Sequence, residues 1–218
     1  MKGLLIKDFK LLKTQQKFFL LVLFIAIAVE MFSGSSSSFL IGYLSFMAIL
    51  FTLSSISYDE FDNGNAFLFS LPITRKSYVI EKYGLGLILG SSFWAFGTLI
   101  VILKEVIANK YISIDTIVAA FSILPVIFVI LAVTLPFQLK FGGEKGRIAM
   151  ISTLVIVFMV GIIMTKTANA LNINLGSLFI QIATFNKAVL ILSIIGFTLL
   201  ALFLSYRISL SIMKKKEF

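Results

Sequence analysis

Cysteine and histidine are absent from this sequence of 218 residues, and charged residues make up only 13% of it. The absence of cysteine excludes disulfides and thiolate metal sites, and the absence of histidine excludes catalytic triads and histidine proton relays. The sequence also indicates no paired buried carboxylates, so an intramembrane hydrolase is the least expected class of protein. The chain is therefore predicted not to be an enzyme and to bind no metal or cofactor of its own.

Hydrophobic residues are abundant instead, at 59% of the chain, whereas soluble domains are about 45–50% apolar and about 25% charged. This composition predicts an all-α integral membrane protein that forms a single transmembrane domain over residues 1–218. The net charge of +9 suggests a nucleic-acid partner at first sight. The basic residues, however, fall in short clusters between long apolar runs and are not interleaved with aromatics, so we expect no nucleic acid to be bound.

Apolar runs near the length that crosses a bilayer, roughly 20 residues at about 1.5 Å per residue, predict six transmembrane helices. The six predicted spans are Phe18–Ser33, Phe39–Ser57, Gly84–Leu103, Thr116–Leu139, Ile148–Thr165 and Ala188–Tyr206. The first is short and carries Glu30 near its far end. The fourth contains Pro125 and Pro136, which are expected to kink it or to mark a boundary.

The distribution of lysine and arginine predicts the orientation, because these residues resist translocation when they lie in short loops. Fifteen of the 19 basic residues fall at the two ends of the chain and in the second and fourth connections. The remaining four are Lys104, Lys110, Lys166 and Lys187. We therefore predict a multi-pass protein with both termini in the cytoplasm.

Residues 1–17 predict an amphipathic elbow helix that lies along the cytoplasmic face of the membrane. On a helical wheel their lysines share one arc, and most of their leucines and Phe9 occupy the opposite one. A cleaved signal peptide is the alternative, because Ala26-Ile27-Ala28 matches a cleavage pattern. That pattern lies inside the apolar run rather than after it, which favours an uncleaved span.

The longest polar connection covers residues 58–83, with the sequence YDEFDNGNAFLFSLPITRKSYVIEKY. It opens with an acidic cluster of Asp59, Glu60 and Asp62, followed by the turn sequence Asn63-Gly64-Asn65. Residues Ala66–Leu71 are apolar but too few to span a membrane. We interpret this connection either as a docking element or as an ordinary solvated loop.

The second half of this connection predicts the start of a helix. Thr74 is placed to cap a helix that continues into the third span, and Pro72 blocks its extension backwards. Ile73 and Tyr78 occupy the two positions of a hydrophobic staple. One helix is therefore expected to run from Thr74 into the membrane.

Three ionisable residues, Glu30, Lys104 and Glu105, lie near the predicted outer ends of the spans. We interpret them either as interfacial residues within reach of water or as the polar lining of a transport pathway. Residues 166–186 alternate polar with apolar side chains and predict an external re-entrant or interfacial element. Gly86-x-x-x-Gly90 would let the third span approach another helix closely.

The connection Gln138–Arg147 contains a glycine-rich sequence that superficially resembles a phosphate-binding loop. Such a loop needs G-x-x-x-x-G-K followed by Ser or Thr, and this pattern does not occur in the chain. Hydrolysis of ATP by that route is therefore excluded. We expect a flexible turn between the fourth and fifth spans.

In their order and spacing these segments resemble the permease subunits of bacterial ATP-binding-cassette exporters of the type-two ABC permease superfamily. The resemblance covers the whole chain and is carried by the opening MKGLLIKDF, the YDEF cluster and LPITRKSYVIEKY before the third span. It implies that the cytoplasmic connection carries a coupling helix, which docks on a separate ATPase subunit and is braced by the amphipathic helix. The docking surface implied by position consists of Asp59, Glu60, Leu71, Pro72, Ile73, Thr74, Arg75 and Lys76, with Lys10 and Lys13 nearby.

The resemblance also implies the partners and the location. Two ATPase subunits would bind ATP and magnesium, and a second permease chain, identical or related, would pair through the first and fifth spans in the bacterial plasma membrane. Similar small permeases export antimicrobial or cytolytic peptides, including bacteriocins and phenol-soluble modulins. The 23 phenylalanines would suit an amphipathic or hydrophobic cargo, although phenylalanine is also simply common in membrane helices.

Two other functions remain open from the residues alone. An ion- or proton-coupled secondary transporter would need embedded acids or histidines and an internal repeat, which the sequence does not convincingly provide. A membrane immunity protein that sequesters a peptide without transporting it is the second alternative.

Overall fold

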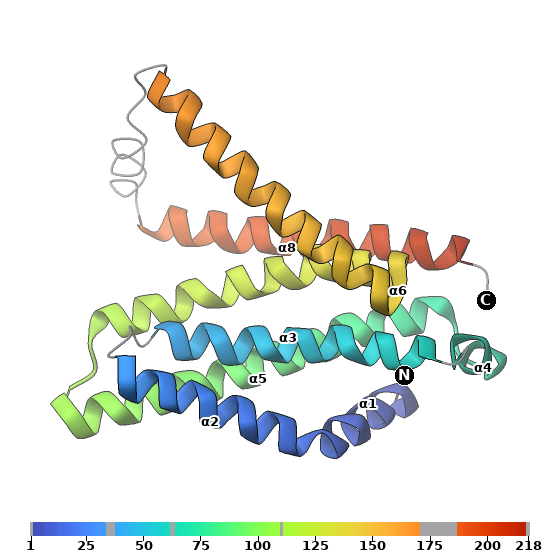
Figure 1. Ribbon diagram of the computed structural model, residues 1–218, viewed down its shortest axis with the longest axis horizontal. Coiled ribbons are helices and arrows are strands. Elements are labelled where there is room, and N and C mark those ends of the chain that lie inside the picture. Colours follow the sequence, from blue (N-terminus) through green and yellow to red (C-terminus); the bar gives the residue numbers. More distant parts are fainter. Residues whose placement is uncertain (1, 34–37, 62–63, 110, 171–186, 217–218) are drawn as a thin grey trace.

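The described residues of the computed structural model, 2–33, 38–61, 64–109, 111–170 and 187–216, form helices, and none of them forms a strand (Figure 1). This confirms the predicted all-α class. The helices are α1 Lys2–Thr14, α2 Gln16–Ser33, α3 Ser38–Glu60, α4 Gly64–Ser70, α5 Arg75–Asn109, α6 Ile114–Ala170 and α8 Lys187–Lys215.

Four stretches are long and apolar enough to cross a membrane: Ser38–Glu60, Arg75–Ile107, Ile114–Gly143 and Val189–Lys215. A fifth arises if α1 and α2, which meet at a bend of 62°, are counted together as one broken span. The described residues thus provide four to five candidate spans, and the count of six stays a prediction. The predicted fifth span lies in the second arm of α6. Of the predicted re-entrant segment, residues 171–186 lie outside the described residues.

Helix α3 is the centre of the bundle and packs against α5 and α6, while α8 packs mainly against α6. About 61% of the apolar window of α3 is buried, against 11% for α8, so α8 presents most of its surface outward. The main core joins α3, α5 and α6 through side chains such as Ile49, Tyr78 and Leu131. Such an arrangement leaves the outer helices to contact lipid or a partner.

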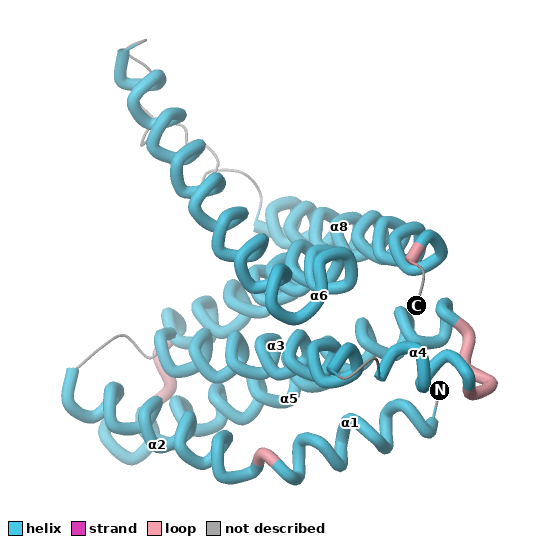
Figure 2. Tube along the Cα trace, turned by 45° about the vertical axis from the view of Figure 1, so that its right-hand side comes forward, coloured by secondary structure: helices cyan, strands magenta, loops and turns pink. Residues whose placement is uncertain are grey.

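Helix α6 consists of two arms that meet at Gly142, whose φ of 78° and ψ of −175° break the helix. The second arm turns away from the bundle in both views (Figures 1 and 2). Neither Pro125 nor Pro136 ends the helix, so neither marks the boundary that the sequence analysis considered. In place of the expected flexible turn over 138–147, two helical arms meet directly at Gly142. A residue with a side chain is strained in this positive-φ conformation, which explains why glycine stands at the break.

Glycine also brings α5 and α6 into close contact, as the sequence predicted for Gly86. A Cβ atom at Gly86 would lie 2.7 Å from Leu131 Cδ1, and one at Gly90 would lie 3.6 Å from Phe128 Cε1. The G-x-x-x-G pattern therefore marks the face of α5 against which α6 packs.

The ends of the bundle differ in their polar content. The end that holds α4, called the α4 end below, also contains the beginning of α1, the beginning of α5 and the end of α8 (Figure 1). Both ends of the described chain therefore lie together, as an even number of crossings would require. The side of the membrane that the α4 end faces remains a prediction.

Candidate functional site

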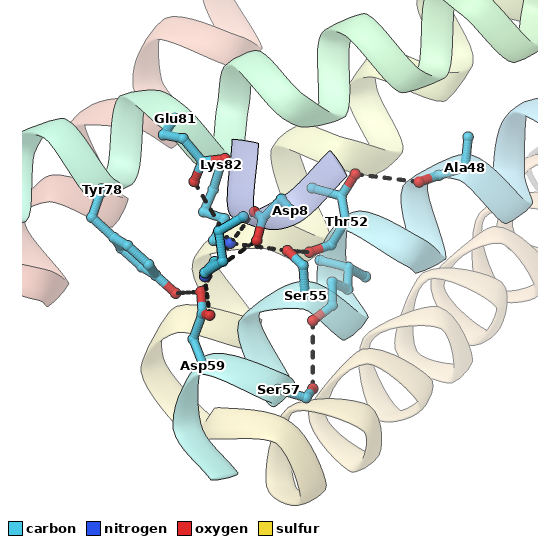
Figure 3. Close-up of polar contacts among 11 residues, drawn as sticks. Asp8, Ala48, Thr52, Ser55, Ser57, Asp59, Tyr78, Glu81 and Lys82 are labelled. Carbon is cyan, nitrogen blue, oxygen red and sulfur yellow. Dashed lines mark hydrogen bonds and ion pairs between the residues drawn. The ribbon is translucent and has the colours of Figure 1, made fainter. Parts of the chain in front are cut away.

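A buried ionic cluster at the α4 end joins α1, α3 and α5 (Figure 3). Its centre is Lys82 of α5, whose side chain is completely buried. The Lys82 Nζ atom lies 2.5 Å from Asp8 Oδ2, 2.9 Å from Asp59 Oδ2 and 3.0 Å from Ser55 Oγ. A buried ammonium is tolerated only when charges and hydrogen bonds replace its water shell, and these three partners provide them.

The same cluster includes two further donors, the ammonium group of Lys7 and the hydroxyl group of Tyr78. Lys7 of α1 forms an ion pair with Asp59, and its Nζ atom lies 3.2 Å from Asp8 Oδ1. The Tyr78 hydroxyl donates to Asp59 Oδ2 over 3.1 Å. Asp59, at the end of α3, therefore holds α1 through Lys7 and α5 through both Tyr78 and Lys82.

Glu81 adds a third carboxylate to the cluster, with its Oε2 atom 3.6 Å from Lys82 Nζ and its side chain fully buried. The sequence analysis found no paired buried carboxylates, and this was wrong, because folding brings Asp8, Asp59 and Glu81 together from three helices. Asp8 lies in α1, before the four spans. Burial alone would raise the pKa of Asp8, but the charge and hydrogen bond of Lys82, with the charge of Lys7, outweigh burial. The pKa of Asp8 is therefore below its ordinary value.

Glu60, the neighbour of Asp59, faces a different set of helices. Its Oε2 atom accepts a hydrogen bond of 2.8 Å from the Gly143 backbone N–H, and its Oε1 atom lies 2.6 Å from Lys216 Nζ. Lys216 also donates to the Leu139 carbonyl over 3.0 Å. A Cβ atom at Gly142 would lie only 2.7 Å from Glu60 Oε2, so the break in α6 is shaped around this carboxylate. Two consecutive residues thus tie the end of α3 to α1 and α5 on one side and to α6 and the end of α8 on the other.

Helix α4 follows this junction directly. A Cβ atom at Gly64 would lie 2.7 Å from the Asp59 carbonyl oxygen, so the first residue of α4 contacts the end of α3 closely. Leu68 is buried, whereas Phe67 is 70% exposed. Large apolar side chains are exposed before, within and after α4: these are Tyr58, Phe61, Phe67 and Leu71, called the α4 patch below. The turn residues Asp62 and Asn63 lie outside the described residues.

The beginning of α5 confirms the predicted cap. The Ser77 backbone N–H donates to Thr74 Oγ1 over 3.1 Å, and α5 starts at Arg75. Arg75 Nη1 donates to the carbonyls of Met213 and Lys214, over 3.0 and 2.6 Å. These carbonyls belong to the last turn of α8, which has no intrahelical donors left, so Arg75 fastens α8 to the start of α5.

The residues predicted to dock a partner therefore fall into two groups. Asp59, Glu60 and Arg75 point to partners inside the chain, and Ile73 is partly buried against the core. The exposed members are Leu71, Pro72, Thr74 and Lys76 beside α4, and Lys10 and Lys13 on α1.

The sequence analysis did not identify Asp8, Glu81, Lys216 or the structural role of Lys82. One signal for Asp8 was available. Asp8 follows Leu4 by one helical turn and precedes Leu11 and Leu12 by another, so an acid stands on the apolar face of an amphipathic helix. An acid in that position indicates a buried cationic partner.

At the opposite end, the three predicted pathway residues make contacts between helices. Lys104 Nζ lies 2.6 Å from Glu30 Oε1, which joins α5 to α2, and the Glu30 side chain is almost fully buried. Glu105 accepts hydrogen bonds from the Ser113 backbone N–H, at 3.0 Å, and from the Thr116 hydroxyl, at the start of α6. Their role as a pathway lining stays a prediction.

A hollow of about 840 Å³ lies beside the junction of α3 and α6. Its lining combines apolar and uncharged polar side chains: Gln15, Phe18, Met47, Leu50, Phe51, Leu53, Ser54, Ser57, Tyr58, Phe61 and Gln138. Gln138 donates to Ser57 Oγ over 2.9 Å, and Gln15 donates to the Tyr58 hydroxyl over 2.8 Å. The hollow therefore begins at the α4 patch and has an amphipathic wall.

The comparisons with known proteins agree with the resemblance inferred from the sequence. No curated protein and no solved structure matches the chain. The family model described as ABC-2 family transporter protein matches residues 3–214, which include both arms of α6 and the cluster around Lys82. The chain therefore belongs to the ABC-2 transporter family and is a transmembrane subunit of an ABC transporter.

Proposed function

We propose that the chain is the permease subunit of an exporter that moves an amphipathic or hydrophobic cargo, a cytolytic or antimicrobial peptide, and that two separate ATPase subunits drive it. The observation that carries this proposal is the position of α4. This short helix carries Phe67 of the α4 patch and closely follows Asp59 and Glu60, the two residues that connect α3 to α1, α5, α6 and α8. A force applied to α4 would therefore reach all of these helices.

In this proposal ATP and magnesium are held by the ATPase subunits, and this chain contributes the docking surface. Phe67 and Leu71 of the α4 patch are the anchors, because large exposed apolar side chains contribute most to a protein interface. Lys76, at the start of α5, and Lys10 and Lys13, on α1, are exposed charges that would orient the partner. When the ATPases close, α4 moves, and Asp59 and Glu60 transmit the movement to the spans.

The hollow beside α3, lined also by Gln15 and Phe18 and by Gln138 of α6, is the proposed entrance of the cargo pathway. Its aromatic side chains, Phe18, Phe51 and Phe61, suit the apolar face of a peptide, and Gln15 and Gln138 offer hydrogen bonds to its polar face. The second permease chain would complete the pathway by packing against α2 and the second arm of α6. Phe24 and Leu20 of α2 are 74% and 63% exposed, which leaves an apolar surface for this contact.

Two measurements test the proposal. Purification from native membranes in a mild detergent should recover an ATPase subunit, and membrane vesicles that contain the complex should move a labelled amphipathic peptide only when ATP is supplied. Transport that stops when the proton gradient is dissipated, while ATP remains, would instead indicate a secondary transporter. Peptide binding without movement would indicate an immunity protein.

The docking surface can be tested separately. Replacing Phe67 and Leu71 together by alanine should lower the amount of co-purified ATPase roughly tenfold or more, because truncated anchors typically cost that much in affinity. Phe197 and Leu199 of α8 are 64% and 62% exposed and serve as the matched control pair. If both double variants retain the ATPase equally, α4 is not the docking element.

A further inference from the structure

A second groove lies between α6 and α8 and is separate from the hollow proposed for the cargo. It has a volume of about 630 Å³ and is lined mainly by apolar side chains. Its lining residues are Ala132, Val133, Pro136, Phe137, Lys140, Ala201, Leu204, Ser205, Ile208, Ser211, Ile212 and Lys215. Leu204 and Ile208 are about half exposed, so the apolar wall is open to the surroundings of the bundle.

The floor of this groove has its hydrogen bonds satisfied within the chain. Pro136 has no N–H group, so the Ala132 carbonyl, four residues earlier, loses its helical donor. The Ser205 hydroxyl of α8 donates to this carbonyl instead, and the Tyr83 hydroxyl contacts both Ser205 and Ser209, the latter at 2.9 Å. This network joins α5, α6 and α8. Because the Ala132 carbonyl and the Ser205 hydroxyl already have hydrogen-bond partners, they do not need a polar ligand.

The charges of the groove stand at one end of it. Lys140 is the last lining residue along α6 and Lys215 is the last along α8, and both are exposed at the α4 end. Among the described residues neither lysine forms an ion pair, and no acidic side chain lines the groove. The groove therefore combines an apolar wall at membrane depth with two cations at the membrane surface.

We propose that this groove binds an anionic phospholipid, with the phosphate between Lys140 and Lys215 and an acyl chain along Pro136, Leu204 and Ile208. Basic pockets between transmembrane helices bind anionic headgroups because each lysine near the surface attracts them, and the long lysine side chain reaches the interface from below. Charge favours this occupant over a second copy of the chain, because two lysines without an acidic counterpart do not suit an apolar helix interface. The inference requires only that the chain lies in a bilayer and is independent of the cargo.

The experiment uses a tryptophan reporter in the full chain, reconstituted in vesicles. The single native tryptophan, Trp94, hydrogen-bonds to the Ala120 carbonyl and is absent from the groove lining, so Trp94→Phe removes the background. Leu204→Trp then places the reporter in the groove. Quenching is compared between phosphatidylglycerol and phosphatidylcholine that carry brominated acyl chains. We expect a preference of roughly 30-fold for the anionic lipid, as two lysines near the surface would produce.

The matched variants separate the groove from general surface charge. Lys140→Gln with Lys215→Gln should reduce the preference to about equal binding, whereas Lys10→Gln with Lys76→Gln, which removes the same charge elsewhere, should preserve it. Equal quenching by both lipids in the parent, or a preference unchanged by the groove variants, overturns the proposal. Quenching by neither lipid would show a groove covered by protein and also overturns it. Loss of the preference on addition of inorganic phosphate would identify a free-anion site and not a lipid site.

Discussion

At the scale of single residues, the ionic cluster is built around a lysine with no exposed side-chain surface. Lys82 is held by Asp8, Asp59 and Ser55, which come from two other helices. Charges in such a place contribute little net stability compared with apolar residues of similar size, but removing one partner leaves the others buried and unpaired. The cluster therefore acts as a specific fastening of α1 to α3 and α5.

Lys82→Met is the most direct test of this fastening. It leaves Asp8 and Asp59 buried without their main cation, so we expect a loss of about 3–5 kcal/mol in the free energy of unfolding. Adding Asp8→Leu to Lys82→Met should recover part of this loss, because one of the three stranded carboxylates, those of Asp8, Asp59 and Glu81, is then gone. Thermal unfolding in detergent, followed by circular dichroism, measures both effects. A double variant less stable than Lys82→Met alone would contradict the pairing of Lys82 with Asp8.

At the scale of elements, local rules predicted much of the structure. Apolar runs predicted α3, α5 and α8, Thr74 predicted the start of α5, and the Gly86 pattern predicted the close approach of α6. Each of these features has a pattern of residues that are close together in the sequence, so the sequence alone was enough to predict it.

The features that could not be predicted depend on contacts between distant residues. The sequence placed Asp59 and Glu60 in an acidic cluster on the docking surface. In the structure both carboxylates instead contact other helices of the chain: Asp59 contacts α1 and α5, and Glu60 contacts α6 and the end of α8. The sequence around Gly142 was interpreted as a flexible turn between two spans. The structure places there the Glu60 carboxylate, 82 positions away in the chain, which contacts Gly142 and accepts a hydrogen bond from the Gly143 N–H.

The packing of α5 on α6 supports a prediction that compares two glycines in the same helix. Gly86→Ala places a methyl group 2.7 Å from Cδ1 of Leu131, which is fully buried. Overpacking of this kind costs about 1–3 kcal/mol. Gly84→Ala meets no atom within 4 Å and should be neutral or slightly stabilising, because alanine has the higher helix propensity. Thermal unfolding of the two variants should therefore differ in sign or size, and equal stabilities would contradict the tight contact.

At the scale of the whole molecule, the two ends of the bundle differ in their polar contacts. The α4 end concentrates the ion pairs of Asp59, Glu60, Lys82 and Lys216, together with the exposed α4 patch. The opposite end has simpler contacts, the pair of Glu30 with Lys104 and the cap made by Glu105. This polarity is what a protein driven from one side requires, since the force must enter where the helices are connected.

The orientation of this polarity can be measured because the chain has no cysteine of its own. Single substitutions Lys76→Cys, beside α4, and Tyr111→Cys, between α5 and α6, place one exposed thiol at each end. The distribution of basic residues predicts that a membrane-impermeant maleimide labels Tyr111→Cys in intact cells and labels Lys76→Cys only after the cells are opened. Since ATP is available to a partner only in the cytoplasm, labelling of Lys76→Cys in intact cells would place α4 outside and would exclude it as the docking element.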